Sequence, residues 1–331
     1  YADVDGDMKN DAIVRDDTDC FWVGKSHGAG FHRFYIWVKH GPTIKGQMQF
    51  RDVNGDWKAD GLYFDVSRTK KVWVNISTGD GFQTQTPWAD YSHRNSVPEN
   101  MQYTNVTNDE RIDALYFDTS ANGAVCLSAS DGTTFAPSQC WNQQGGSEPT
   151  QMQYADANYD GFIDYLYFDT YRSNRVFVGL SKKRYIAHGL HIIWDGFAPD
   201  SAWIQHGPST PDMMRYQDVN GDGKADSLYF DTARSNGVYV GLSDGTRFSN
   251  PTQWLQHGPS TPDMMQYADV NRDGKADALY FDTWRSVMVW VGLSDGNRFE
   301  TPTNWIQHGT STPDLMHYAD VNGDECPDSL Y

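Results

Sequence analysis

The most informative segment of this chain is Asp218-Val-Asn-Gly-Asp-Gly-Lys-Ala-Asp226. Side-chain oxygens stand at positions 1, 3, 5 and 9 of the stretch, on Asp218, Asn220, Asp222 and Asp226. The main-chain carbonyl at position 7 is a natural fifth donor. Ca²⁺ takes about 6–8 hard oxygen ligands in a flexible shell, so this spacing predicts a calcium-binding loop.

The flanking residues predict strands rather than helices. An EF-hand would need a glutamate at position 12, and that position is Tyr229, inside the apolar run Ser-Leu-Tyr-Phe. We therefore expect the loop to join two neighbouring strands. An ordinary acidic hairpin turn is the alternative for a single copy of such a loop.

The loop is repeated along the whole chain. Copies begin at Asp3, Asp52, Asn105, Asp156, Asp218, Asp269 and Asp320, at intervals of 49, 53, 51, 62, 51 and 51 residues. A period near 50 residues indicates stacked supersecondary units, so we expect one domain over residues 1–331.

Six of the seven loops keep the ligand spacing, and the third departs from it. In the third loop Thr107 replaces an acid or amide, so we expect weak or absent metal binding there. The predicted structural Ca²⁺ ligands are Asp3, Asp5, Asp7 and Asp11; Asp52, Asn54, Asp56 and Asp60; Asp156, Asn158, Asp160 and Asp164; Asp218, Asn220, Asp222 and Asp226; Asp269, Asn271, Asp273 and Asp277; and Asp320, Asn322, Asp324 and Asp328.

Each repeat is expected to contain four strands. In the fifth repeat these are Met213–Gln217, Ser227–Asp231, Val238–Ser243 and Gln253–His257, separated by Gly-, Ser-, Asn- and Pro-rich turns. Four antiparallel strands in every 50 residues are typical of a β-propeller blade. Because a seventh loop follows six complete repeats, we expect an all-β, seven-bladed propeller, with six blades as the alternative.

The composition limits the partners. The formal net charge is −18, and the loops hold nearly half of the 44 Asp and Glu residues. We read this acidity as a requirement of metal binding. The chain has no basic stripe for nucleic acid and no apolar run long enough to span a membrane. We expect a secreted protein, and a homo-oligomer is compatible with the sequence.

Four cysteines allow two disulfides. Cys126 and Cys140 stand on neighbouring predicted strands of one repeat. Cys20 lies in the first repeat and Cys326 in the last, so a bridge between them would clasp a closed ring. Four free thiols are the alternative, and disulfides would indicate an oxidising compartment.

Nine-residue Asp/Asn loops inside four-stranded repeats resemble the FG-GAP/VCBS propeller family, which includes integrin α-subunit heads and integrin-like fungal lectins. The resemblance covers essentially the whole chain and implies calcium at the loop residues named above. The fold hosts adhesion proteins, lectins, toxin shells and polysaccharide lyases, so the resemblance alone does not determine an activity.

A polar and aromatic set recurs in the late repeats, on the side of the blades expected to lie opposite the acidic loops. Trp suits the apolar face of a sugar ring, while Gln, His and Arg supply hydrogen bonds, and repetition would add avidity. Packing between blades is the alternative role for the Trp residues. The candidate glycan-binding residues are Trp203, Gln205, His206, Trp254, Gln256, His257, Trp305, Gln307, His308, Arg172, Arg234 and Arg285, with a partial copy at Trp37 and His40.

Three functions follow as expectations. A calcium-stabilised lectin that binds glycans or glycoproteins without catalysis is the first. A polysaccharide lyase is the second, because the fourth repeat has an insertion of 11 residues within 182–198. An adhesion or toxin-shell scaffold is the third. The insertion residues considered for catalysis or metal binding are Arg184, Tyr185, His188, His191, Trp194 and Asp195.

Overall fold

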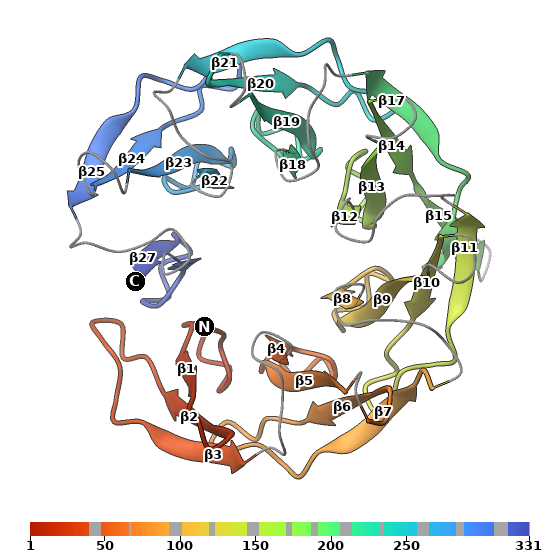
Figure 1. Cartoon of the computed structure of the whole chain (residues 1–331), viewed down its shortest axis with the longest axis vertical. Helices are drawn as coiled ribbons and strands as arrows, with labels where there is room; N and C mark the ends of the chain where they lie inside the picture. The colour runs from red at the N-terminus through yellow and green to blue at the C-terminus, as the bar shows by residue number, and fades with distance from the viewer. Residues whose placement is uncertain are drawn as a thin grey trace. The chain divides into compact units, whose positions relative to one another are not determined.

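The computed structural model is an all-β chain (Figure 1). It describes residues 1–39, 48–65, 68–92, 101–118, 123–143, 152–169, 174–186, 191–205, 214–231, 235–256, 265–282, 288–307 and 317–330. Within these ranges no helix is long and apolar enough to cross a membrane. The strands form six β-propeller blades, each a sheet of three or four antiparallel strands.

The chain divides into two compact units. The first comprises Tyr1–Pro149, Arg184–Trp194 and Ala319–Asp328, and the second comprises Thr150–Lys183, Asp195–Tyr318 and Ser329–Tyr331. Blades 1–3 belong to the first unit and blades 4–6 to the second.

Blades 1–3 follow the order of the chain. In blade 1 an isolated bridge between Ala2 and Asp11 stands where the other blades have their first strand. The strands are β1 (Ala12–Arg15), β2 (Cys20–Gly24) and β3 (Tyr35–Lys39) in blade 1; β4 (Met48–Arg51), β5 (Asp60–Asp65), β6 (Lys71–Asn75) and β7 (Thr86–Asp90) in blade 2; and β8 (Met101–Thr104), β9 (Asp113–Asp118), β10 (Ala124–Ser128) and β11 (Gln139–Gln143) in blade 3.

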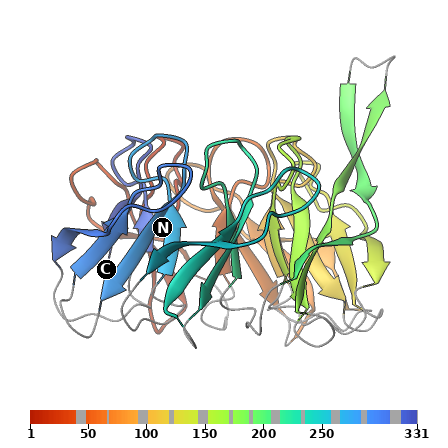
Figure 2. The same cartoon turned by 90° about the horizontal axis from the view of Figure 1, so that it is seen from above.

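Blades 4–6 have four strands each. Blade 4 is interrupted by the insertion, which forms a separate two-stranded hairpin of β15 (Ser181–Ile186) and β16 (His191–Phe197) (Figure 2). The blade strands are β12 (Met152–Ala155), β13 (Asp164–Asp169), β14 (Arg175–Gly179) and β17 (Ser201–Gln205) in blade 4; β18 (Met214–Gln217), β19 (Asp226–Asp231), β20 (Gly237–Gly241) and β21 (Thr252–Gln256) in blade 5; and β22 (Met265–Ala268), β23 (Asp277–Asp282), β24 (Met288–Gly292) and β25 (Thr303–Gln307) in blade 6.

The expected number of blades is corrected from seven to six. The seventh repeat contributes only β26 (His317–Ala319) and β27 (Asp328–Leu330), which pair in a two-stranded sheet. The described residues of this repeat include no third or fourth strand, so its acidic loop is present without a complete blade.

In blades 2–5 the second strand is almost entirely buried. Its recurrent sequence, Asp-x-Leu-Tyr-Phe-Asp, is buried at every position in β9, and in β5 likewise. A strand covered on both faces needs a nearly continuous apolar run rather than an alternating one. Apolar clusters then extend from one blade to the next, as in the cluster that contains Phe64, Trp88, Tyr116 and Phe135 of blades 2 and 3.

Candidate functional site

The acidic loops are hairpin connections between the first and second strands of the blades. In blade 5 the loop joins β18 to β19, and Gln217 pairs with Asp226 at its base. The Asp218 carboxylate accepts main-chain N–H bonds from Gly221 and Gly223, both at 2.7 Å. Gly221 and Gly223 have φ of 79° and 83°, which glycine adopts without steric cost. The loop therefore folds around its first aspartate.

The aspartate at position 9 is buried at the base of the first six loops. In blade 5, Asp226 accepts N–H bonds from Val219 at 3.1 Å and from Ser243 at 2.7 Å. Burial, with a smaller contribution from the carboxylates of Asp222 and Asp218, raises the pKa of Asp226 to about 7 against the lowering effect of these hydrogen bonds. Burial raises the pKa of Asp60 and Asp164 to about 7 as well. A nearby cation would relieve this unfavourable charge.

The donors of these loops match a hard cation. In the first loop, carboxylate oxygens of Asp3, Asp5 and Asp11 lie within 4.8 Å of one another. A lysine at position 7 offsets part of the charge, because Lys9 Nζ lies 2.8 Å from Asp7 Oδ2. Oxygen ligands alone, with several carboxylates, are the set that Ca²⁺ prefers.

The third loop differs from the others in its contacts as well as its sequence. The Thr107 main chain and hydroxyl donate to Asp113 Oδ2 at 3.0 and 3.1 Å. Arg111 pairs with Asp109 Oδ2 at 2.5 Å, as the lysine at the same position does in the first loop. The Thr107 hydroxyl thus occupies a carboxylate oxygen of Asp113 that a metal would use in the other loops.

A recurrent serine connects the first, second, fourth, fifth and seventh acidic loops to the following blade, and it is not among the residues predicted from the sequence. The serine opens the Ser-Asp-Gly turn or its equivalent after the third strand. Ser243 Oγ donates to the carbonyl of Ala157 at 2.6 Å, and Ser294 Oγ donates to that of Val219 at 2.5 Å. In the first unit the equivalent bonds run from Ser26 to Val321, from Ser77 to Val4 and from Ser130 to Val53. The signal in the sequence was a serine 17 residues after the aspartate at position 9 in blades 2–6.

A main-chain hydrogen bond also connects neighbouring acidic loops. The N–H at loop position 8 donates to the carbonyl at position 1 of the preceding loop, as from Ala225 to Asp156 at 2.8 Å and from Ala276 to Asp218 at 2.7 Å. Within the first unit, the loop of the seventh repeat contacts blade 1 in this way, through Asn10 N–H and the Asp320 carbonyl at 2.7 Å. The acidic loops are therefore the joints between blades.

The tryptophans proposed to bind glycans mostly pack between blades. Trp203 and Trp254 are only 5% and 6% exposed. Their rings meet Phe248 and Phe299 of the next blade edge to face, with centroids 5.1 and 5.4 Å apart. The pair Trp37–Phe82 in the first unit has the same geometry. Among the described members of the glycan set, Trp305 differs, because it is 50% exposed.

The other predicted glycan residues are only partly described. Gln205, Gln256 and Gln307 are exposed at the ends of the fourth strands. Gln256 Nε2 donates to the Ser235 carbonyl at 2.7 Å. Outside the described residues lie His40, His206, His257, His308, Arg172, Arg234 and Arg285.

The insertion residues lie on the β15–β16 hairpin. Arg184, Tyr185 and Asp195 are exposed. Trp194 packs edge to face on Trp141, with ring centroids 4.8 Å apart, so this residue has a packing role. His188 and the side chain of His191 lie outside the described residues.

The cysteines form one disulfide. Cys126 and Cys140 face each other across β10 and β11 and are bonded. Cys20 and Cys326 are not disulfide-bonded, so the expected clasp is not formed. Cys20 follows the turn at the far end of β1, whereas Cys326 lies in the acidic loop that contacts Asn10 before β1 begins.

Comparisons with known proteins support the repeat assignment. A family model described as FG-GAP-like repeat matches residues 218–280. Among solved structures, the chain is similar to part of the Photorhabdus luminescens Tc holotoxin pore, with a TM-score of 0.57 and 16% identity over 99% of this chain and 14% of that one. The TcdB2–TccC3 complex matches with a TM-score of 0.43 and 15% identity, over 96% of this chain and 15% of that one. The V. cholerae biofilm matrix protein Bap1 matches with a TM-score of 0.25 and 12% identity, over 98% of this chain and 71% of that one.

These identities show the fold alone, and the chain spans about one-seventh of the toxin chains it matches. No protein of curated function matches the sequence. The matched repeat, its recurrence at the other acidic loops and the six blades together make this chain a β-propeller of FG-GAP-like repeats.

Proposed function

We propose that this chain is a non-catalytic scaffold: a calcium-stabilised propeller module of a larger secreted protein. The observation that carries the proposal is the double role of the acidic loops. The loop that presents the predicted Ca²⁺ ligands Asp218, Asn220, Asp222 and Asp226 also binds the following blade through the carbonyls of Asp218 and Val219. An ion in the loop would therefore stabilise the joint between two blades.

The chain's own residues define what the ion would do. The carboxylates at positions 1, 5 and 9 repel one another, and burial already makes the charged form of Asp226 unfavourable. Bound Ca²⁺ supplies positive charge that offsets this repulsion. Because the unfolded chain has no preformed site, binding adds to folding stability by mass action.

Two features support contact with other proteins. The similar Photorhabdus luminescens structure is a Tc holotoxin pore, and this chain corresponds to only 14% of that chain. In addition, Met8 and Trp57 are 80% and 72% exposed on the first two loops, at φ of 66° and 67°. Exposed apolar side chains at backbone positions that favour glycine are costly unless a partner covers them.

Carbohydrate binding is the second candidate. The exposure of Trp305 beside Gln307 at the end of blade 6 favours it. The burial of Trp203 and Trp254 reduces the number of such sites, because a buried ring cannot stack on a sugar.

The test is a pair of measurements on the whole chain. Thermal unfolding should show a marked fall in Tm when EDTA removes calcium, with recovery on adding Ca²⁺ but not Mg²⁺, since Mg²⁺ demands a smaller octahedral site. A glycan array with the calcium-loaded protein should be blank. An unchanged Tm in EDTA would remove the role assigned to calcium, and saturable sugar binding lost in Trp305→Ala would replace the scaffold by the lectin.

A further inference from the structure

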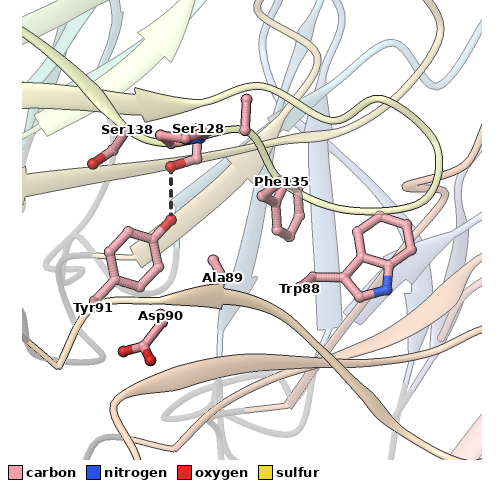
Figure 3. Close-up of a pocket in the computed structure, with 9 residues that line it drawn as sticks. Trp88, Ala89, Asp90, Tyr91, Ser128, Phe135 and Ser138 are labelled. Atoms are coloured by element: carbon pink, nitrogen blue, oxygen red, sulfur yellow. Dashed lines mark hydrogen bonds between the residues drawn. The ribbon is translucent and has the colours of Figure 1, made fainter.

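A cavity of about 320 Å³ lies at the joint between blades 2 and 3, within the first unit. It is bounded by β7 on one side and by the end of β10 and the following turn on the other (Figure 3). Its volume is at the lower end of the range for small-molecule pockets. No loop ligand or predicted glycan residue lines it.

The cavity arises where this joint departs from the repeat. At the joint between blades 4 and 5, Ile204 points at Gly241: a Cβ on that glycine would lie 3.3 Å from Ile204 Cδ1. Blade 2 has Ala89 in place of Ile204, and blade 3 has Ser128 in place of Gly241. The substitution of Ile by Ala removes the side chain that fills the joint, and the substitution of Gly by Ser adds a hydroxyl to its wall.

The wall combines aromatic rings with hydroxyl groups. Trp88 and Phe135 meet edge to face at 5.4 Å. The hydroxyls of Tyr91 and Ser128 are hydrogen-bonded at 2.9 Å, and both residues are at least 98% buried (Figure 3). A hydroxyl oxygen has one donor and two acceptor sites, so Ser128 retains capacity beyond its bond to Tyr91.

The interior carries no uncompensated charge. Asp90 is the charged residue of the lining, and in Figure 3 its carboxylate is directed away from Ser128. That carboxylate accepts the Ser92 N–H at 2.9 Å and lies 3.5 Å from Lys71 Nζ. A ligand would therefore meet ring carbons and neutral hydroxyls.

We propose that this cavity binds a small uncharged alcohol, with an apolar frame about the size of one six-membered ring and a hydroxyl that joins the Tyr91–Ser128 pair. A purely apolar ligand would leave the buried hydroxyl pair facing carbon, which costs the hydrogen bonds that water otherwise supplies. A pyranose brings more hydroxyls than this lining can satisfy, and each unpaired one would be penalised. An ammonium compound would enter without a counter-charge.

The experiment is ligand-observed saturation-transfer NMR on the full chain with cyclohexanol. Methylcyclohexane, cyclohexylammonium and methyl glucoside serve as comparison ligands. We expect saturable binding of cyclohexanol and at least tenfold weaker binding of the other three. Ser128→Ala should weaken cyclohexanol binding about tenfold, which is the scale of one hydrogen bond.

A double variant gives the matched control. Ala89→Ile with Ser128→Gly restores the residue pair found at positions 204 and 241, and it should abolish binding with Tm unchanged or raised. If that variant does not fold, Ala89→Leu, which copies Leu255 of the next joint, takes its place. Cyclohexanol binding that survives in the folded cavity-filling variant would overturn the proposal. So would the absence of saturation in the unmodified protein, or equal binding of methylcyclohexane, cyclohexylammonium or methyl glucoside.

Discussion

The hydroxyl of Ser243 donates a hydrogen bond of 2.6 Å to the main-chain carbonyl of Ala157, 86 residues earlier in the chain. The same serine donates its main-chain N–H to Asp226, the last ligand position of its own blade's loop. One residue thus links the predicted metal site of blade 5 to that of blade 4. Because this link recurs, the acidic loops contribute to the stability of the contacts between neighbouring blades.

We predict that Ser243→Ala lowers the free energy of unfolding of the second unit by about 1–3 kcal/mol, because the buried Ala157 carbonyl loses its donor. Urea unfolding followed by circular dichroism measures the change. Ser201→Ala on the exposed end of β17 is the control and should shift stability by less than about 0.5 kcal/mol. Equal effects of the two substitutions would contradict the proposed link.

Calcium binding should differ between the fifth loop and the third loop. Asp222→Asn removes a carboxylate from the fifth loop and should eliminate one Ca²⁺ from the stoichiometry measured by isothermal titration calorimetry. Asp109→Asn in the third loop should leave the stoichiometry unchanged, because Thr107 replaces a ligand there and its hydroxyl already occupies Asp113. Loss of an ion in Asp109→Asn would show that the third loop also binds metal.

The stability of the protein should also depend on pH through Asp113 of the third loop. Burial raises the pKa of Asp113 from 3.8 to about 6. Between these values the folded state holds a proton that the unfolded state has released, so this group makes stability fall as the pH rises from about 4 to about 6. Above pH 6 the penalty is constant.

In calcium-loaded protein, the Tm of the unmodified chain should therefore rise relative to the Tm of Asp113→Asn as the pH is lowered from 7 to 5. Thermal melts across this range measure it. A difference that is constant with pH would mean that Asp113 titrates at its ordinary pKa.

Replacing a tryptophan that packs between two blades should lower the free energy of unfolding. Trp254→Ala removes a ring that is 6% exposed and packed on Phe299, so we expect a loss of about 3–5 kcal/mol, as for other buried aromatic residues. Trp305→Ala removes a ring that is half exposed and should cost much less. Denaturant unfolding separates the two, and similar losses would indicate that Trp305 is covered in solution.

Much of the fold follows from local patterns. The loop spacing predicted hairpins at Asp218 and its copies, and the alternation within Val238–Ser243 predicted a strand that the structure places at Gly237–Gly241. These features are local, because a turn and a strand period depend on residues close in sequence. The predicted number of blades was wrong, because the described strands form six sheets of blade type and β26 and β27 pair only with each other.

The repeat, the strand order within a blade and the residue types at the predicted metal sites could be read from the sequence, because they recur at a nearly fixed spacing. The contacts between blades could not: they are the bond from Ser243 to Ala157, the burial of Trp254 on Phe299, the separation of Cys20 from Cys326, and the cavity beside Ala89. Packing between blades joins residues that are far apart in sequence, by 86 positions for Ser243 and Ala157 and by 310 for Asn10 and Asp320. Whether a tryptophan faces solvent or a neighbouring ring depends on that packing and not on the residues beside it.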